Sequence, residues 1–397
     1  MESKRRAFPR FYFTSTAVLL DILSNGNVPA KVQVHMSQCF QAIDKLKLDN
    51  EDTNTTARPN GLGMISCVGK EFIEFRKPLP LTGKVEEYMN AIIAKMRGEL
   101  RDVLSDSIKA YSSKPRTEWL LDWPSQIILV VNGITWTQEV ETAILDFQKG
   151  DKNALKKCSQ TQVKQLSDLI SMTRTPLEKP DRQKVMNMIT IDAHNRDITL
   201  SLVEKKTDKL SSFDWACQLR GYWDNTIGDC RLKICDASFP YGYEYLGNGG
   251  RLVITPLTDR IYITATQACW LSLGTAPQGP AGTGKTETTK DLSAQLGKSV
   301  YVFNCSPEMD YRTMGDIFKG LAASGSWGCF DEFNRLVPSV LSVCSVQYKA
   351  ICDAQRVKSL LPGRGLDYID KEGTKHKAVE NYKFTAADGV EMPLEEG

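Results

Sequence analysis

The chain has 397 residues, which is too long for one ordinary hydrophobic core and predicts two or three domains. Its 50 Lys and Arg nearly balance 48 Asp and Glu, so the net charge of +2 provides no field that would attract nucleic acid or an acidic membrane. The 11 cysteines form no C-x-x-C pair and the three histidines are scattered, which disfavours a zinc site and indicates a reducing compartment such as the cytoplasm.

The N-terminal segment is a poor signal peptide, because polar residues and Asp21 interrupt its apolar run FYFTSTAVLLDIL. The most apolar stretch, Ile127 to Val131, is far too short to span a bilayer. The sequence therefore predicts a soluble protein with no membrane partner.

The first two thirds of the chain are predicted to be mainly helical. From Val85 to Tyr111, apolar residues recur at steps of three and four, which indicates one long amphipathic helix with Gly98 as the candidate for a bend. Similar patterns predict helices over residues 137–147, 163–170 and 181–202. Their apolar stripes, with Val163 and Ile170 among them, are expected to pack in a core.

Tryptophans are frequent in this helical part: Trp119, Trp123, Trp136, Trp215 and Trp223. Aromatic residues interleaved with basic ones can form a stacking surface for nucleic acid. The balanced charge favours burial between helices instead, so no nucleic-acid partner is predicted.

The composition changes near residues 236–246, where we place a domain boundary, with residues 1–240 before it and 241–397 after it. Beyond the boundary the pattern is that of an α/β nucleotide-binding fold: a phosphate loop and helix, then strands over 299–305 and 326–330, each followed by a helix. The polar stretch from Pro362 is predicted to be an exposed loop or insertion, and a hairpin is predicted around Asp388 and Gly389.

The phosphate loop reads GPAGTGKT and comprises Gly279, Pro280, Ala281, Gly282, Thr283, Gly284, Lys285 and Thr286. Its glycines allow successive backbone N–H groups to face an anion. Lys285 is the cation for the outer phosphates, and Thr286 supplies a hydroxyl to Mg²⁺. The segment GTAPQ before the loop is a short and weak strand, whereas the preceding IYITATQACWLSL is typical of a helix.

An acidic pair, Asp331 and Glu332, follows the short apolar strand GCF. Asp331 is predicted to hold Mg²⁺, and Glu332 to polarise the water that attacks the γ-phosphate. Asn304, on the strand expected beside this one, either hydrogen-bonds Glu332 or only satisfies a turn. The acidic pair favours a hydrolase over a small-molecule kinase, and the absence of an N-K-x-D segment disfavours a GTPase.

An apolar segment upstream of the loop is the candidate for the adenine pocket, and its residues are Val253, Ile254, Pro256 and Leu257. Asp259 and Arg260 are interpreted as helix-capping residues. The cluster of Asp192, His194, Arg196 and Asp197 has no nucleophile beside it and is interpreted as structural.

Four segments around the site, RLVITPLTDR, GPAGTGKTETTKDL, VYVFNCS and GCFDEFNR, together resemble the first AAA+ module of dynein heavy chains. Upstream segments, among them RRAFPRFYF, WLLDWPSQ, SFDWACQLR and YEYLGN, resemble the C-terminal part of the dynein linker. The segments LLDILSNG and ICDASFPYGYEYLGN look most like axonemal outer-arm chains of the beta or gamma type. The resemblance covers nearly the whole chain.

The resemblance implies a fold and a function. Residues 1–240 would be a mainly helical linker, and residues 241–397 the large α/β subdomain of a P-loop AAA+ module, truncated before the sensor strand and lid. ATP and Mg²⁺ would be the ligands. The partners would be the remaining AAA+ modules, intermediate and light chains, and microtubules bound through regions outside this chain, in the cytoplasm and the ciliary axoneme.

The same resemblance implies that an arginine finger comes from a neighbouring module, so these residues alone would be nearly inactive. Two other functions stay open on the sequence. One is a stand-alone AAA+ ATPase, and the other is a regulatory module that binds nucleotide without hydrolysing it.

Overall fold

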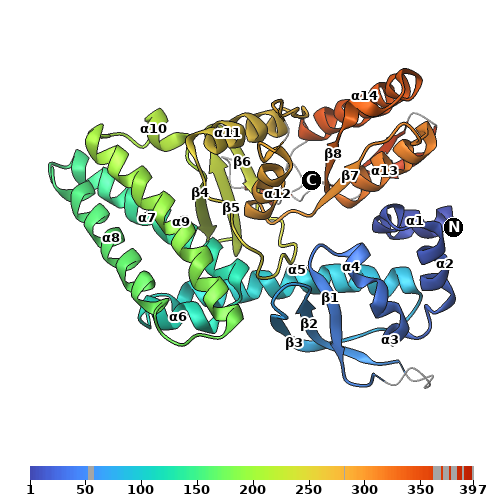
Figure 1. The fold of residues 1–397 in the computed structure, drawn as a ribbon, viewed down its shortest axis with the longest axis horizontal. Coiled ribbons are helices and arrows are strands. Elements are labelled where there is room, and N and C mark those ends of the chain that lie inside the picture. Colours follow the sequence, from blue (N-terminus) through green and yellow to red (C-terminus); the bar gives the residue numbers. More distant parts are fainter. Residues whose placement is uncertain are drawn as a thin grey trace.

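A computed structural model describes residues 1–51, 58–280, 282–360, 368–369, 375–376, 382–386 and 389–395. Ala281 and most of the polar stretch after Pro362 therefore lie outside the described residues. Within them, no helix is long and apolar enough to cross a membrane. Figure 1 shows an N-terminal unit in blue, a helical unit in green, and a nucleotide-binding unit in orange and red.

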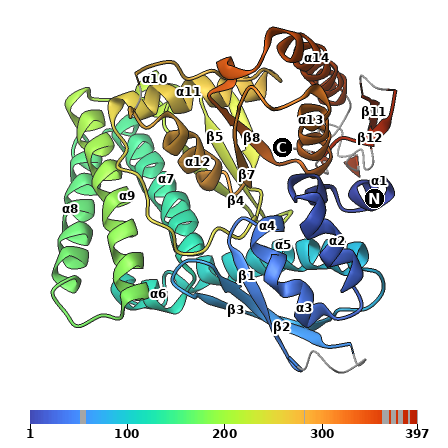
Figure 2. The same cartoon turned by 45° about the vertical axis from the view of Figure 1, so that its right-hand side comes forward.

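The N-terminal unit packs short helices against a three-stranded antiparallel sheet of order β1-β2-β3. Its elements are α1 (Glu2–Ala7), η1 (Pro9–Phe13), α2 (Thr16–Ser24), α3 (Pro29–Val32), η2 (Gln33–His35), α4 (Met36–Cys39), β1 (Ile43–Leu48), β2 (Asn60–Ser66) and β3 (Phe72–Pro80). The long helix α5 (Val85–Ala110) then runs beneath this unit towards the helical one (Figure 2). The prediction of this helix is confirmed, and it continues through Gly98 without interruption.

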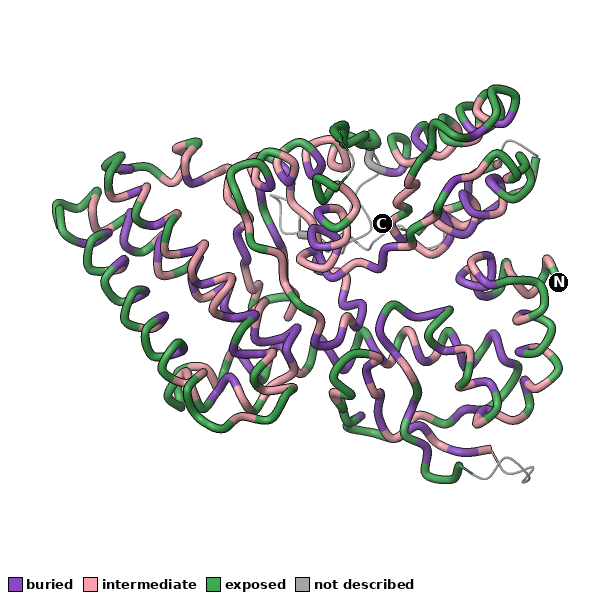
Figure 3. Tube along the Cα trace, in the orientation of Figure 1, coloured by how far each residue is buried: buried purple, intermediate pink, exposed green. Residues whose placement is uncertain are grey.

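The helical unit confirms the three other predicted helices and extends each of them. Its elements are α6 (Arg116–Asp122), α7 (Ser125–Gln148), α8 (Ala154–Met172), α9 (Lys179–Glu204) and α10 (Phe213–Ala216). Leu166 is buried as expected, but Val163 and Ile170 are 44% and 43% exposed. The prediction of a buried stripe was wrong for these two, because α8 lies at the outer edge of the unit with one face turned to solvent (Figure 3).

The tryptophans are part of the packing. Trp119, Trp136 and Trp215 are each 5% exposed or less, and the rings of Trp136 and Trp215 lie 5.1 Å apart. Burial on this scale removes these rings from any stacking surface, as the balanced charge indicated.

Two small sheets in the first 240 residues were not predicted. One is β1-β2-β3, and the other joins β4 (Arg220–Asp224), β5 (Asp229–Ile234) and β6 (Ala237–Pro240) in antiparallel order. The mainly helical character still holds. These strands are only four to nine residues long and gain their stability from pairing with neighbours.

The nucleotide-binding unit follows the predicted order of elements. These are α11 (Pro256–Trp270), α12 (Lys285–Gln295), β7 (Val300–Asn304), α13 (Tyr311–Ser324), β8 (Trp327–Asp331), η3 (Phe333–Arg335) and α14 (Pro338–Leu360). Strands β7 and β8 pair in parallel. The apolar segment before the phosphate loop is helix α11, as predicted, whereas the weak strand considered for residues 274–278 does not form.

Short strands follow α14: β9 (Tyr368–Ile369), β10 (Lys375–His376), β11 (Lys383–Thr385) and β12 (Glu391–Pro393). Strands β11 and β12 pair antiparallel, which confirms the predicted hairpin, although Asp388 in its turn lies outside the described residues. Phe384 and Met392 of this hairpin are buried in one cluster with Tyr12 of η1 and Ala323 of α13.

The N-terminal unit contacts the nucleotide-binding unit directly through η1 and α13. Gly320 permits this approach, because a Cβ there would lie 2.7 Å from the Cβ of Tyr12. The Phe13 ring lies 4.0 Å from that of Tyr301 on β7, and Arg5 forms an ion pair of 3.3 Å with Asp316 on α13.

Candidate functional site

The phosphate loop leads directly into α12. Gly284 is the N-cap of this helix with φ +78°, and Gly282 has φ +76°, a left-handed conformation that glycine adopts without steric cost. The helix therefore begins at Lys285 with unpaired backbone N–H groups, and the positive end of its dipole lies at the loop. This arrangement is suited to binding an anion.

The loop's side chains hold its own backbone. The Lys285 Nζ donates to the carbonyl oxygens of Gly279 and Pro280 at 2.9 and 2.7 Å, and the Thr283 hydroxyl donates to Pro280 O at 2.9 Å. The described loop residues, Gly279, Pro280, Gly282, Thr283 and Gly284, are exposed. The Lys285 ammonium thus lies within the curl of the loop.

Thr286 and Asp331 come together across the site. The Thr286 hydroxyl donates to the Asp331 carboxylate at 3.2 Å, although 44 residues separate them in the chain. Helix α12 carries the hydroxyl, and the C-terminal end of β8 carries the carboxylate. A hydroxyl and a carboxylate oxygen at this distance are the donor types that Mg²⁺ takes from a protein, with phosphate oxygens and water completing its shell.

Glu332 directly follows β8 in a conformation that non-glycine residues seldom adopt. Its φ is +53°, in the left-handed region, and such positions cluster at functional sites. Its backbone N–H donates to the Asp331 Oδ1 at 3.1 Å, and its carboxylate lies 3.4 Å from the Arg335 Nε. Glu332 thus lies in a tight turn at the end of β8 and forms an exposed ion pair with Arg335.

Asn304 lies at the C-terminal end of β7, beside Asp331 in the register of the two strands. Its side chain is exposed, and no hydrogen bond joins it to Glu332 in the described part of the chain. The strand pairing brings Asn304 to the same edge as the acidic pair.

The candidate adenine residues lie in different surroundings. Val253 and Leu257 are 73% and 63% exposed, and Pro256, at the start of α11, is also exposed. Ile254 lines a cavity of about 430 Å³ between α7, α9, α11 and α12. The structure brings only Ile254 of the four into this cavity.

Asp291 on α12 is a positioning residue that the sequence analysis missed. Its buried carboxylate accepts hydrogen bonds from Tyr262 Oη at 2.5 Å and Gln295 Nε2 at 3.1 Å, and it pairs with Arg251 at 3.2 Å. Burial and this carboxylate raise the pKa of the Tyr262 hydroxyl. Asp291 thereby fixes α12 against the segment that carries Ile254. A carboxylate in the middle of a short, mostly polar helix is a weak signal in the sequence.

Asp192 has the structural role expected for its cluster. Arg116 on α6 binds its carboxylate with two hydrogen bonds of 2.7 and 2.9 Å, and the Asn132 amide donates a third. His194 lies 3.9 Å from Asp259 and takes no part in this cluster.

Comparison with known proteins extends over the whole chain. Residues 1–107 match the family model described as dynein heavy chain, N-terminal region 2, and residues 241–360 match the one described as the hydrolytic ATP binding site of the dynein motor region. The chain is 72% identical over all 397 residues to the dynein alpha chain of the flagellar outer arm of Chlamydomonas reinhardtii. The chain is a homologue of the axonemal dynein heavy chains.

Other relatives of this dynein homologue are more distant. Identity is 49% over 358 residues to the ciliary dynein beta chain of Tripneustes gratilla and 48% to the human dynein axonemal heavy chain 9. The expected axonemal outer-arm relationship is confirmed. Identity is higher to this alpha chain than to the ciliary beta chain, so the comparison does not support the expected beta type. The chain spans 9% of the length of the alpha chain and 8% of the other two.

Proposed function

We propose that this chain provides the main ATPase site of an axonemal dynein heavy chain together with the linker segment that the site moves. The contact between Thr286 and Asp331 carries the proposal, because a hydroxyl and a carboxylate lie 3.2 Å apart there, and these are the kinds of group that hold Mg²⁺ in P-loop hydrolases. The match of residues 241–360 to a hydrolytic ATP-binding region supports it.

The described residues of the phosphate loop would bind ATP in two ways. The backbone N–H groups from Gly282 to Thr286 would hydrogen-bond the phosphates, and Lys285, now bound to the loop carbonyls, would supply a positive charge to them. Thr286 and Asp331 would hold Mg²⁺, which would supply charge neutralisation for the phosphates. Ile254 would contact the base, whereas Val253, Pro256 and Leu257 lie on the exposed surface outside the cavity that Ile254 lines.

Hydrolysis depends on Glu332. As a carboxylate it would accept a proton from the attacking water. Release from Arg335, which lies 3.4 Å from its carboxylate, would free it for this task. Asn304 lies beside Asp331 at the end of β7 and would hydrogen-bond Glu332 only after that release.

The motor function extends beyond these residues. In the intact heavy chain, ATP hydrolysis here drives a swing of the linker and the sliding of ciliary microtubules. The partners are the other AAA+ modules of the same chain, intermediate and light chains, and microtubules, in the axoneme. The names of the relatives, flagellar and ciliary, support this location for the homologue.

Replacement of Lys285 tests nucleotide binding. We expect Lys285→Ala to weaken binding of fluorescent Mg-ATP by about 10- to 100-fold, because a charge-assisted hydrogen bond contributes about 1.5–3 kcal/mol. Titration of the 397-residue chain measures the affinity. Lys319→Ala, on α13 in the same unit, is the control and should bind like the unaltered chain. Equal affinities for all three would contradict the assigned site.

The 397-residue chain by itself is expected to turn over ATP far more slowly than the intact heavy chain. An arginine finger from a neighbouring module raises hydrolysis by about 10³–10⁵-fold in other nucleotide hydrolases. Phosphate release at saturating Mg-ATP measures both rates. A 397-residue chain that hydrolyses at the rate of the heavy chain would favour the stand-alone ATPase.

A further inference from the structure

Residues 241–245, here called the strap, connect the N-terminal, helical and nucleotide-binding units. The strap reads YGYEY and has no regular secondary structure. Tyr241, Tyr243, Glu244 and Tyr245 are each 3% exposed or less. A segment without a helix or strand that is buried this deeply has its conformation set by the elements around it.

The strap rests on the turn that ends α12. Gly242 N donates to Leu296 O, and Glu244 N donates to Gly297 O, each at 2.9 Å. The backbones touch so closely that a Cβ on Gly242 would lie 2.5 Å from Gly297 O. Gly297 has φ +65°, and a Cβ there would lie 2.6 Å from the Tyr241 ring.

Helix α12 joins this turn to the phosphate loop. It has 11 residues, from Lys285 to Gln295, and is therefore about 16 Å long at the usual helical rise. A helix of this length is expected to move as one body. A displacement of the phosphate loop would therefore reach the turn on which the strap rests.

Three tyrosines hold the strap to the helical and sheet elements. Tyr241 Oη accepts from Gln126 Nε2 of α7 at 2.7 Å, and the same amide nitrogen donates to Glu244 O at 2.7 Å. Tyr243 Oη donates to Asp229 of β5 at 2.7 Å. Tyr245 Oη donates to Glu71 at 2.9 Å, and Glu71 also accepts from the first backbone N–H of α7, at Ser125.

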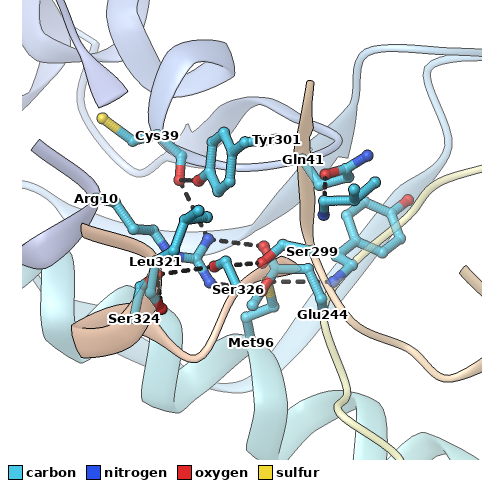
Figure 4. Close-up of polar contacts among 12 residues, drawn as sticks. Arg10, Cys39, Gln41, Met96, Glu244, Ser299, Tyr301, Leu321, Ser324 and Ser326 are labelled. Carbon is cyan, nitrogen blue, oxygen red and sulfur yellow. Dashed lines mark hydrogen bonds and ion pairs between the residues drawn. The ribbon is translucent and has the colours of Figure 1, made fainter. Parts of the chain in front are cut away.

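Glu244 fastens the N-terminal unit to the strap. Its carboxylate binds the Arg10 guanidinium of η1 through two hydrogen bonds of 2.7 and 2.6 Å. Figure 4 shows Arg10 between Glu244 and the carbonyl of Cys39, which it also binds at 3.1 Å. Burial opposes the charge of Arg10, but the carboxylate of Glu244 outweighs it and raises the guanidinium pKa.

A second contact ties the same unit to β7. Tyr301 Oη donates to the Cys39 carbonyl at 3.1 Å, and Val300 N donates to Gln41 Oε1 at 3.1 Å (Figure 4). Strand β7 ends at Asn304 beside Asp331. The N-terminal unit thus contacts β7 directly and α12 through the strap, in each case at the end remote from the phosphate site.

We propose that the strap is a joint that transmits movement of α12 to the N-terminal and helical units, with the Arg10–Glu244 pair as its clasp. The proposal rests on the ATPase function proposed above. Loss of the Arg10–Glu244 pair would leave ATP turnover unchanged, because the pair lies away from the phosphate loop. The N-terminal unit would then follow the movement of α12 less closely, so microtubule sliding would slow while ATP turnover persists.

The test replaces the clasp with apolar groups in the full-length heavy chain, as Arg10→Met with Glu244→Leu. This double change leaves no unpaired buried charge, so the chain is expected to fold. The matched control is Arg116→Met with Asp192→Leu, which removes another two-bond Arg–carboxylate pair within the helical unit. ATP turnover and microtubule sliding velocity are measured for both variants and for the unaltered chain.

The clasp variant is expected to keep its ATP turnover and to slide microtubules about threefold or more slowly, a loss within the usual range for coupling mutations. The control should match the unaltered chain in both. The proposal that the strap is a joint would be overturned by any of three results. These are an unchanged sliding velocity, an equal loss of velocity in both variants, or an ATP turnover that falls in proportion to the velocity. An unaltered heavy chain without ATP turnover would instead refute the proposed function.

If the clasp variant does not fold, Gln126→Leu provides the same comparison. It removes the two hydrogen bonds from α7 to the strap and changes no charge. This variant is again expected to keep its ATP turnover and to slide microtubules more slowly. A sliding velocity equal to that of the unaltered chain would contradict the proposed joint.

Discussion

Glu332→Gln in the full-length heavy chain is expected to reduce ATP turnover by about 10²–10⁴-fold, the usual contribution of a general base. Glutamine has nearly the same shape but cannot accept the proton of the attacking water. Mg-ATP binding should persist, because Lys285, Thr286 and Asp331 are unchanged. Phosphate release and equilibrium binding of labelled ATP measure the two effects separately.

The control for this change is Glu204→Gln at the exposed C-terminal end of α9. It makes the same chemical change far from the phosphate loop and should leave turnover unaltered. Microtubule sliding provides the decisive comparison. If Glu332→Gln slides microtubules as fast as the unaltered chain, the site regulates by binding nucleotide and does not hydrolyse it for movement.

Arg10→Met is expected to lower the free energy of unfolding by about 3–5 kcal/mol, because it leaves the buried Glu244 carboxylate without its partner. Chemical denaturation of the 397-residue chain measures the change. Adding Glu244→Leu removes the unpaired charge and should restore much of the loss. The recovery distinguishes an ionic cause from a simple loss of side-chain volume.

An exposed ion pair provides the comparison for Arg10. Lys205 binds Asp214 at 2.6 Å, but both side chains are in contact with solvent. Lys205→Met should therefore cause little or no change in stability, since water replaces the lost contact. Equal effects of Arg10→Met and Lys205→Met would show that the Arg10–Glu244 pair is not a buried structural contact.

Local pattern was sufficient to predict most of the nucleotide-binding unit. The phosphate loop, helices α11 and α12, and strands β7 and β8 follow from residue spacing, because each element is specified within about a dozen residues. The acidic pair after β8 was recognisable for the same reason. The short sheets of the first 240 residues were missed because their stability comes from pairing between strands. A run of four to nine residues is a weak signal without its partner strand, even where it alternates as β5 does.

By itself, the sequence determined the candidate residues for binding and hydrolysing ATP, and the motifs that relate the chain to dynein heavy chains. Only the tertiary structure decided which residues meet. It placed Thr286 against Asp331 and Arg10 against Glu244, and it left Val163 and Val253 facing solvent. The physical reason is that the residues of a motif are neighbours in the chain, so the sequence alone shows them together. An ion pair such as Arg10–Glu244 joins residues 234 positions apart and forms only when several elements pack against one another.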